Sequence, residues 1–519
     1  MSWNYDRSRD RITAHLDGMG AIEVAPLTRA ADLEMLLTET TCREITGAHV
    51  YVDVSNFAAL ASEGSYADDA KRLVQGVHVY QREVNRLVEG SGLFGAYPGY
   101  SVHFQGAKLH ALFYRPITDD AVLATHAVVL QLVLRDFVKT VFNPAFPYYD
   151  NFVVAGGADV GKAIGTRNGT RGDRELLFLG NPANRAAKII RGPGTLRLTD
   201  RVYDVLPEVL QDLCTAVGSG ADYRLRMLTS DELDDVLEEL DLVWDRERSA
   251  ERVAEDKAAL PLKDVGVSGA TELIDLDALS AVNSKRVTAA SLFADVSGFT
   301  KYVEAADTAE AQEDALRVFH AIRRELAAVL RRDFGALRVQ YQGDRVQGLL
   351  HLPTDDAAAI TTRAVEAAIG MQSSMERTLK VLLPEASPLS LAVGVDVGTT
   401  LVSKLGTRGQ RDRICLGASV EAAAANEERV AGGQIGVSHA VHAHLPEGLQ
   451  EYFVEDEGLG CYVATGLTAE KVERAARVKA MYAGRQAPAF VRSTAAGATV
   501  SAVQSSGARA VEPAKRYGR

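Results

Sequence analysis

The sequence lacks the cysteine pattern of a disulfide-stabilised or zinc-binding protein. Its 519 residues include only four cysteines, and these stand far apart, without the paired spacing of a metal site. In a protein of ordinary apolar and charged content, isolated cysteines indicate reduced thiols in a cytoplasmic protein. The cysteines are Cys42, Cys214, Cys415 and Cys461.

Long apolar segments are also missing. The N-terminal sequence MSWNYDRSRDR has no apolar stretch of the kind that signal peptides carry. No run approaches the about 18 apolar residues that a membrane-spanning helix needs. The net charge of −12 argues against a dedicated binder of nucleic acid or of anionic membranes. We therefore expect a soluble, cytoplasmic protein with neither a nucleic acid nor a membrane as partner.

An internal repeat organises the chain, and three landmarks define it. The first is a β-like run that ends in an aspartate, YVDVSNF at residues 51–57 and FADVSGFT at 293–300. The second is a hairpin turn, VHFQGA at 102–107 and VQYQGD at 339–344. The third is a glycine-rich loop, GTRGDRELLFLG at 169–180 and GTRGQRDRICLG at 406–417. Gly180 lies 73 residues after Ala107, and Gly417 lies 73 residues after Asp344, so the chain contains one module twice.

Each copy predicts the same order of elements: strand, long helix, β-hairpin, helix, strand, loop, strand and helix. Apolar residues at helical spacing between 313 and 330 predict the long helix of the second copy. Strands interleaved with helices indicate an α+β sandwich.

The repeat divides the chain into five expected segments. Residues 1–44 form a leader, and the acidic linker at 221–285 begins with a predicted capping box at Thr229 and Glu232 that opens a helix running to about Leu260. The two copies occupy residues 45–220 and 286–470. A C-terminal helix and flexible tail take up residues 471–519, which are rich in Ala, Ser, Gly and Val from about residue 486.

Asp295 and Asp344 are the strongest candidates for chemistry, because only the second copy keeps both carboxylates. Carboxylates at the ends of adjacent strands can hold a pair of hard divalent cations. Between them, Ser297, Gly298, Phe299 and Thr300 offer backbone N–H groups that can bind phosphate. Taken singly, Asp295 is also typical of a helix start and Asp344 of a hairpin turn.

These segments resemble the class III nucleotidyl cyclases, which include adenylyl and guanylyl cyclases. FADVSGFT and YQGD match the two metal-binding segments of that family. The resemblance covers both copies and implies tandem cyclase domains, each a ferredoxin-like palm sandwich, packed as a pseudo-heterodimer. It further implies two Mn²⁺ or Mg²⁺ ions held by Asp295, Asp344 and the backbone carbonyl of Val296.

The same resemblance divides the active site between the copies. In the family, the domain opposite the metal site supplies an asparagine and, four positions later, an arginine. In the first copy these positions carry Asn184 and Lys188, whereas the second copy has Glu421 and Ala425 there. The first copy in turn has Ala107 in place of Asp344. One complete site and one defective site are therefore expected.

Several readings of this helix stay open. Asn184 is also typical of a local cap, and Lys188 of a solvated surface cation. Lysine lacks the planar fork of arginine, and Arg185 is a rival for the cationic role, although it points about 100° away on an ideal helix.

Three positions of the first copy correspond to residues that surround the base in the family. They carry Tyr51, His103 and Leu177, which match neither the adenine-specific nor the guanine-specific pattern. Tyr51, His103 and the neighbouring Phe104 are bulky enough to shrink a purine-sized pocket while keeping donors and acceptors. They are also compatible with ordinary strand residues that contact no ligand.

This base pocket resembles the pyrimidine cyclases of bacterial antiphage (Pycsar) systems, as does the form Arg338-x-x-Tyr341-Gln-Gly-Asp. The resemblance implies conversion of UTP, or alternatively CTP, to a 3′,5′-cyclic nucleotide and pyrophosphate. It also implies an effector partner that senses the product. The alternatives are an adenylate or guanylate cyclase with an atypical pocket, and a non-catalytic nucleotide-binding regulator. The chain is expected as a monomer with an internal pseudo-dimer, or as a homodimer.

The one-site expectation predicts unequal effects of three aspartate substitutions. Asp295→Ala and Asp344→Ala should abolish turnover of nucleoside triphosphate, because each removes half of the acidic pair. Asp53→Ala, at the matching position of the defective copy, should leave most of the turnover. The measurement is cyclic product formed per enzyme, and a loss from Asp53→Ala as large as the other two would contradict a single site.

Overall fold

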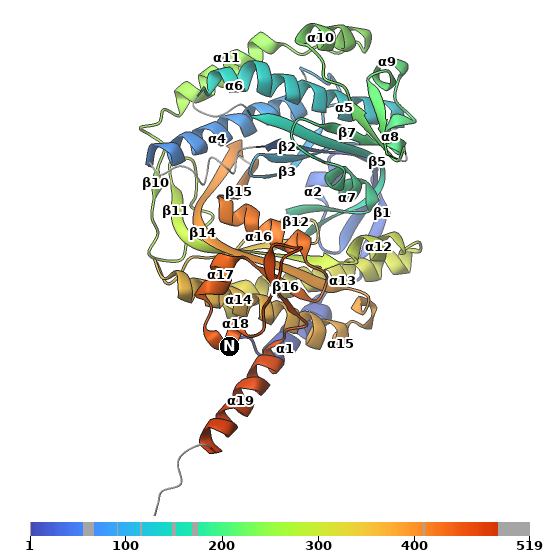
Figure 1. The fold of residues 1–519 in the computed structure, drawn as a ribbon. Helices are drawn as coiled ribbons and strands as arrows, with labels where there is room; N and C mark the ends of the chain where they lie inside the picture. Colours follow the sequence, from blue (N-terminus) through green and yellow to red (C-terminus); the bar gives the residue numbers. More distant parts are fainter. Residues whose placement is uncertain are drawn as a thin grey trace, which may run out of the picture. The chain divides into compact units, whose positions relative to one another are not determined.

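The computed structural model describes residues 2–55, 67–90, 92–114, 117–147, 152–168, 175–218, 220–407 and 410–485. Two mixed sheets of nine strands each dominate it (Figure 1). Their main paths run in the orders β3-β4-β2-β5-β7-β9-β8 and β12-β13-β11-β14-β16-β18-β17. The orders are the same element for element, so the α+β class and the predicted duplication of the fold are confirmed.

The first sheet and its helices belong to the first domain. Its strands are β1 (Glu23–Pro26), β2 (Thr41–Ser55), β3 (Tyr100–Gln105), β4 (Lys108–Phe113), β5 (Val153–Asn168), β6 (Glu175–Leu179), β7 (Leu196–Thr199), β8 (Cys214–Val217) and β9 (Asp222–Leu225). Its helices are α1 (Tyr5–Gly18), α2 (Asp32–Met35), α4 (Ala67–Glu89), α5 (Asp120–Phe137), the π-helix η1 (Val138–Phe142), α6 (Asn143–Ala145), α7 (Asn181–Lys188), α8 (Asp200–Tyr203) and α9 (Glu208–Gln211).

The second domain follows helices α10 (Ser230–Glu239) and α11 (Arg246–Ala259). Its strands are β10 (Val267–Ser268), β11 (Ser284–Ser297), β12 (Leu337–Gln342), β13 (Arg345–Leu350), β14 (Ser390–Thr407), β15 (Gln410–Leu416), β16 (Gln434–Val437), β17 (Val454–Asp456) and β18 (Cys461–Thr465). Its helices are α12 (Phe299–Glu304), α13 (Ala309–Ala328), η2 (Val329–Asp333), α14 (Ala357–Ser373), η3 (Ser374–Leu379), α15 (Lys380–Leu382), η4 (Pro384–Ala386), α16 (Ala418–Arg429), α17 (His439–His444), α18 (Glu447–Gln450) and α19 (Ala469–Arg485).

The hairpin of each domain turns at a glycine in the left-handed region. Gly106 has φ 66° and Gly343 has φ 68°, a conformation that residues with a Cβ adopt at a cost. Both hairpins also contain a β-bulge, between Ser101 and His103 and between Arg338 and Gln340. The repeat therefore extends to irregularities of the backbone.

The linker differs from its prediction. The capping box at Thr229 and Glu232 is present and opens α10. The helix then ends at Glu239, and a second helix, α11, begins after Asp245, so the single helix predicted to about Leu260 is wrong. The helix is interrupted because Asp241 takes a left-handed conformation with φ 55°. The Asp245 side chain then caps the start of α11. The tail predicted from about residue 486 lies outside the described residues.

One helical segment of the described chain, Asp120–Ala145, is long and apolar enough to cross a membrane by length and composition. The expectation that no run of residues approaches the length of a membrane-spanning helix is therefore wrong for this segment. In the folded protein 83% of its most apolar stretch is buried, and α5 packs against β2 and β5. The segment is a core helix of the first domain.

The leader and the linker are equivalent arms, each of which joins the two domains. β1 pairs with β2 in parallel, and β10 pairs in the same way with β11, so each arm adds a strand to the domain that follows it. The helix of each arm packs on the other domain. α1 lies against α13 and η3, whereas α11 lies against α4 and η1 (Figure 1). The domains thus exchange their N-terminal helices.

Charged contacts fix both exchanged helices. On α1, the Arg11 guanidinium donates to Glu325 at 2.6 Å and to Asp333 at 2.9 Å, and both carboxylates are almost fully buried. On α11, the Asp256 carboxylate forms ion pairs with Arg86 at 2.6 Å and with Arg82 at 3.0 Å. Since buried charges need partners, each arm is specified by a charged contact as well as by apolar packing.

Removal of the Arg11 guanidinium should loosen the first arm. Arg11→Leu leaves the buried carboxylate of Glu325 without its cation and leaves Asp333 with Arg7 alone, which should lower the free energy of unfolding by about 3–5 kcal/mol. Chemical denaturation measures this difference. The matched control is Arg9→Leu on the same helix, whose partners Asp6 and Asp10 are exposed, and which should leave the unfolding midpoint unchanged. Equal effects of both substitutions would contradict the specific contact.

Candidate functional site

Asp295 and Asp344 come together at one end of the second sheet. Asp295 lies near the end of β11, and Asp344 lies in the turn between β12 and β13. Because β13 pairs with β11, the turn lies beside the end of β11. Burial raises the pKa of Asp344 well above its usual value, and the nearby Asp295 carboxylate raises it further. Burial likewise raises the pKa of Asp295. The two carboxylates therefore form a close, mutually repelling pair.

The segment after Asp295 turns into a short helix. Val296 and Phe299 are buried, while Ser297 and Thr300 are partly exposed. Gly298 has φ 88° and caps α12, which extends over six residues. The turn is accessible from outside, because Gly298 is exposed.

The first domain approaches this segment with α7. The Asn184 side chain donates a hydrogen bond from Nδ2 to Oγ1 of Thr300 at 3.0 Å, across the domain boundary. Lys188 is exposed, and its charge opposes the rise that burial causes in the pKa of both Asp295 and Asp344. The structure thus brings Asn184 and Lys188 of one domain to the carboxylates of the other.

Arg185 is held elsewhere. Its guanidinium forms an ion pair with Asp200 at 3.0 Å and lies 4.0 Å from Asp159, both in the first domain. Of the two candidate cations of α7, Lys188 is therefore the one that acts on the acidic pair.

The equivalent place in the other half has a different composition. Ala107 stands where Asp344 stands in the second copy, and Glu421 of α16 stands where Asn184 stands in the first. Burial raises the pKa of Glu421, and the Asp53 carboxylate raises it further. Here a carboxylate faces a carboxylate, with no lysine at the position that matches Lys188.

The acidic pair fits a divalent cation by its chemistry. Among the described residues, no group of three or more His, Cys, Asp or Glu side chains is arranged so that it could hold a metal ion. Asp295 and Asp344 nevertheless supply oxygen ligands, and a backbone carbonyl at Val296 would supply a third, which suits hard cations. Burial raises the pKa of Asp295, and the cations Arg345 and Lys188 oppose that rise.

Tyr51 and His103 both contact the ring of His110, whereas Leu177 lies in an apolar cluster that contains none of these three residues. Tyr51 is near enough to Asp344 for that carboxylate to raise its pKa, together with burial. Burial lowers the pKa of His103 to about 4. Leu177 is buried in an apolar cluster with residues of the second domain, and its neighbour Leu176 instead faces the central cavity. Phe104 is fully buried and lines that cavity too.

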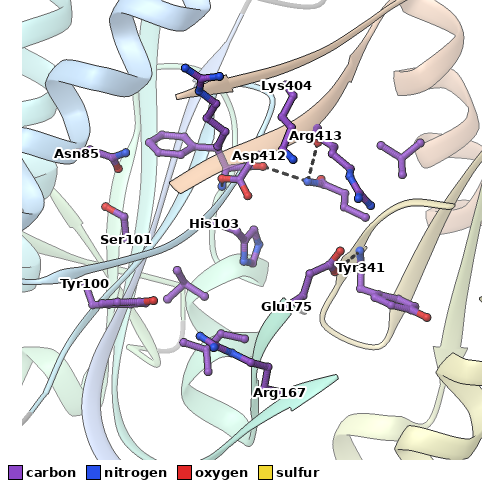
Figure 2. Close-up of a pocket in the computed structure, with 16 residues that line it drawn as sticks. Asn85, Tyr100, Ser101, His103, Arg167, Glu175, Tyr341, Lys404, Asp412 and Arg413 are labelled. Atoms are coloured by element: carbon purple, nitrogen blue, oxygen red, sulfur yellow. Dashed lines mark hydrogen bonds between the residues drawn. The ribbon is translucent and has the colours of Figure 1, made fainter. Parts of the chain in front are cut away.

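The central cavity lies between the domains and measures about 230 Å³ (Figure 2). His103 is the only predicted base-binding residue among those that line it, and the cavity includes neither Asp295 nor Asp344. Two carboxylates on its wall hold the domains together. Glu175 of β6 accepts the backbone N–H of Tyr341 at 2.7 Å, and Asp412 of β15 accepts that of Phe104 at 2.7 Å.

These two contacts are equivalent under the repeat, and the sequence analysis missed them. Glu175 and Asp412 hold matched positions in the two glycine-rich landmarks, which was a signal that could have been read. Each accepts an N–H group that follows a bulge in the hairpin of the opposite domain. We call this pair of contacts the reciprocal clasp.

Comparisons with known proteins find nucleotidyl cyclases among the proteins similar to this chain. Residues 282–464, which contain Asp295 and Asp344, match the family described as the adenylate and guanylate cyclase catalytic domain. The second half therefore contains an adenylate and guanylate cyclase catalytic domain, and the first half has the same strand order.

Individual relatives match most of the chain. It is 29% identical over 446 residues to a uridylate cyclase of Pseudomonas aeruginosa, covering 81% of each chain. It is 28% identical to a uridylate cyclase of a Rhizobium species, covering 80% of this chain and 82% of that one. A class III adenylyl cyclase-like ATP-binding protein from P. aeruginosa has a similar structure, with a TM-score of 0.78, 25% identity, and coverage of 91% of this chain and 99% of that one.

Substitutions on α7 should distinguish its two cations. Lys188→Ala should reduce turnover by about 100-fold, the usual effect of removing one group that stabilises developing charge. Arg185→Ala serves as the matched control, because its partners Asp159 and Asp200 lie within the first domain. It should leave turnover within about threefold of wild type. Steady-state kinetics measures both, and the reverse order of effects would assign the cationic role to Arg185.

Proposed function

We propose that the protein is a uridylate cyclase, which converts UTP to 3′,5′-cyclic UMP and pyrophosphate. The observation that carries the proposal is the division of the site. Asn184 and Lys188 of the first domain meet the acidic pair of the second, and the other half has neither a complete acidic pair nor an asparagine and lysine at the matching positions. The relatives named as uridylate cyclases, which match about four fifths of the chain, support the choice of UTP.

The reaction is an in-line displacement at the α-phosphorus. The ribose 3′-oxygen forms a bond to that phosphorus while its proton is released to solvent. The bond from the α-phosphorus to the oxygen that bridges to the β-phosphorus breaks, and pyrophosphate leaves with that oxygen. Asn184 would orient the ribose, since its amide already lies beside Thr300 of the opposite domain. Lys188 would stabilise charge on the α-phosphoryl oxygens, and backbone N–H groups at 297–300 would bind the remaining phosphates.

Divalent metal belongs to this proposal. Asp295, Asp344 and the Val296 carbonyl would hold two Mn²⁺ or Mg²⁺ ions, which neutralise the triphosphate and increase the acidity of the 3′-hydroxyl. Without such cations, the repulsion between the two carboxylates and an incoming polyphosphate would oppose binding.

The base would lie against Tyr51 and His103. Both are partly buried, and both can donate or accept a hydrogen bond at the edge of a pyrimidine. Leu177 would act through the apolar layer behind the pocket. We further propose that the cyclic product is a second messenger for antiphage defence, sensed by an effector protein, as the resemblance to Pycsar cyclases implies.

A four-nucleotide assay tests the proposal. UTP, CTP, ATP and GTP are supplied separately with Mn²⁺, and cyclic products are quantified by mass spectrometry. We expect cyclic UMP as the main product, with kcat/KM for UTP above that for each purine by about 100-fold or more. The matched control is the Asp344→Ala variant, which should form no cyclic nucleotide.

Other products would overturn the proposal in identifiable ways. Cyclic AMP or cyclic GMP as the main product would mean a purine cyclase with an atypical pocket. If the wild type turned over no triphosphate and Asp344→Ala bound nucleotide equally well, the protein would be a non-catalytic nucleotide-binding regulator.

A further inference from the structure

Three side chains form a row across the first sheet, directly beside the acidic pair of the second domain. In the order β3-β4-β2, His103 pairs with His110, and His110 pairs with Tyr51. Residues paired across neighbouring strands point to the same face of a sheet and contact one another. The row therefore joins both proposed base-contacting residues through His110.

His110 makes its closest ring contact with Tyr51. The two rings stack with centroids 4.2 Å apart and planes 9° apart, which is near-parallel stacking. The His103 ring meets His110 at 5.3 Å with its plane turned by 78°. His110 is thus the shared neighbour of the two residues that would meet the base.

A second layer fixes His110 itself. His49, two residues before Tyr51 on β2, lies with Nδ1 3.0 Å from Nε2 of His110, so one ring donates a hydrogen bond to the other. His110 is 2% exposed and His49 is fully buried. Phe178 contacts both imidazoles at 5.1 Å and 5.9 Å. Burial lowers the pKa of both histidines, so the rings are neutral and can stack without the cost of a buried charge.

The second domain has the same backbone positions without this chemistry. The residues that match His103, His110, Tyr51 and His49 are Gln340, Gln347, Phe293 and Ser291. Gln347 pairs with Gln340 and with Phe293 in the same register, so the fold accepts a glutamine there. The aromatic row is confined to the domain that carries Asn184 and Lys188. A purely structural need of the repeat would appear in both copies.

We propose that His110 is a specificity-determining positioning residue for the pyrimidine base, an inference that rests on the proposed uridylate cyclase activity. His110 holds the Tyr51 ring flat against its own face and limits the tilt of His103. A fixed Tyr51 ring shortens the pocket that a purine would need. A freed ring rotates away and admits a larger base, because packing against His110 defines its position.

Two substitutions at His110 test this role. His110→Gln copies the residue of the second domain, keeps a polar side chain of similar size, and removes the stack. We expect the ratio of kcat/KM for UTP over ATP to fall by about tenfold, with a higher KM for UTP and a smaller change in kcat. His110→Phe keeps a flat ring against Tyr51 and should hold the same ratio within about threefold of wild type.

The matched control is His126→Gln, which replaces another buried histidine of the first domain. His126 packs on Phe94 at 4.7 Å and on Phe113 at 5.4 Å, away from Tyr51. It should leave the UTP to ATP ratio unchanged, even if it lowers the melting temperature. A merely structural role of His110 would lower stability and total activity without changing that ratio.

The outcomes separate this inference from the proposed function. If wild type makes cyclic UMP and His110→Gln, shown to be folded by its melting transition, keeps the wild-type ratio, the inference is wrong and the function stands. If His110→Phe loses selectivity as far as His110→Gln, the ring stack is not the cause. If wild type makes no pyrimidine product, the proposed function fails first.

Discussion

The reciprocal clasp between the two domains is the contact on which the site depends. The candidate groups are divided: carboxylates on one domain, amide and ammonium on the other. Their separation is therefore set by how the domains meet. Glu175 and Asp412 each accept a backbone N–H from the hairpin of the opposite domain, and burial raises the pKa of Asp412 to about 7. A backbone N–H group has no rotamer with which to follow its acceptor. If one domain moved along the other by one residue, both Glu175 and Asp412 would therefore lose their donors.

Most of the fold could be predicted from the sequence, because the repeat supplied two independent readings of the same pattern. Matched spacing from Ala107 to Gly180 and from Asp344 to Gly417 predicted the duplication, and periodicity predicted the helices. The exchange of the arms could not be predicted, because the partners of α1 and α11 are distant in sequence. The arms nevertheless share the pattern Trp-x-x-x-Arg-Ser-x-(Asp/Glu)-Arg, at residues 3–11 and 244–252, which marks them as a further part of the repeat. The break at Asp241 also escaped, because a left-handed aspartate leaves little trace in apolar periodicity.

The candidate site was predictable in part for the same reason. Motif matches pointed to Asn184, Lys188 and the aspartates as individual residues, and the comparison of copies showed that their losses are complementary. The contacts of His110 were invisible to this approach, because strand register decides which residue stacks on Tyr51. Leu177, which the family resemblance placed beside the base, lies in an apolar cluster with residues of the second domain, and its part in base recognition stays a prediction. Matching a residue to a position in another protein predicts where its backbone lies. It does not predict which way its side chain points.

The exchanged helices have a consequence for how this chain can be divided. A cut between the two sheets, at whatever linker residue, would separate the second domain from α1, and a cut before α11 would also separate the first domain from α11. The fragment that begins after the linker would lose α1, whose Arg11 neutralises Glu325 and Asp333, while the first fragment would lose or retain α11 according to the cut. The second half therefore always lacks one of the helices that cover it. Since both arms also belong to one polypeptide, pairing is intramolecular and does not depend on protein concentration. A two-lobed enzyme built in this way can remain assembled when dilute, where separate subunits would dissociate.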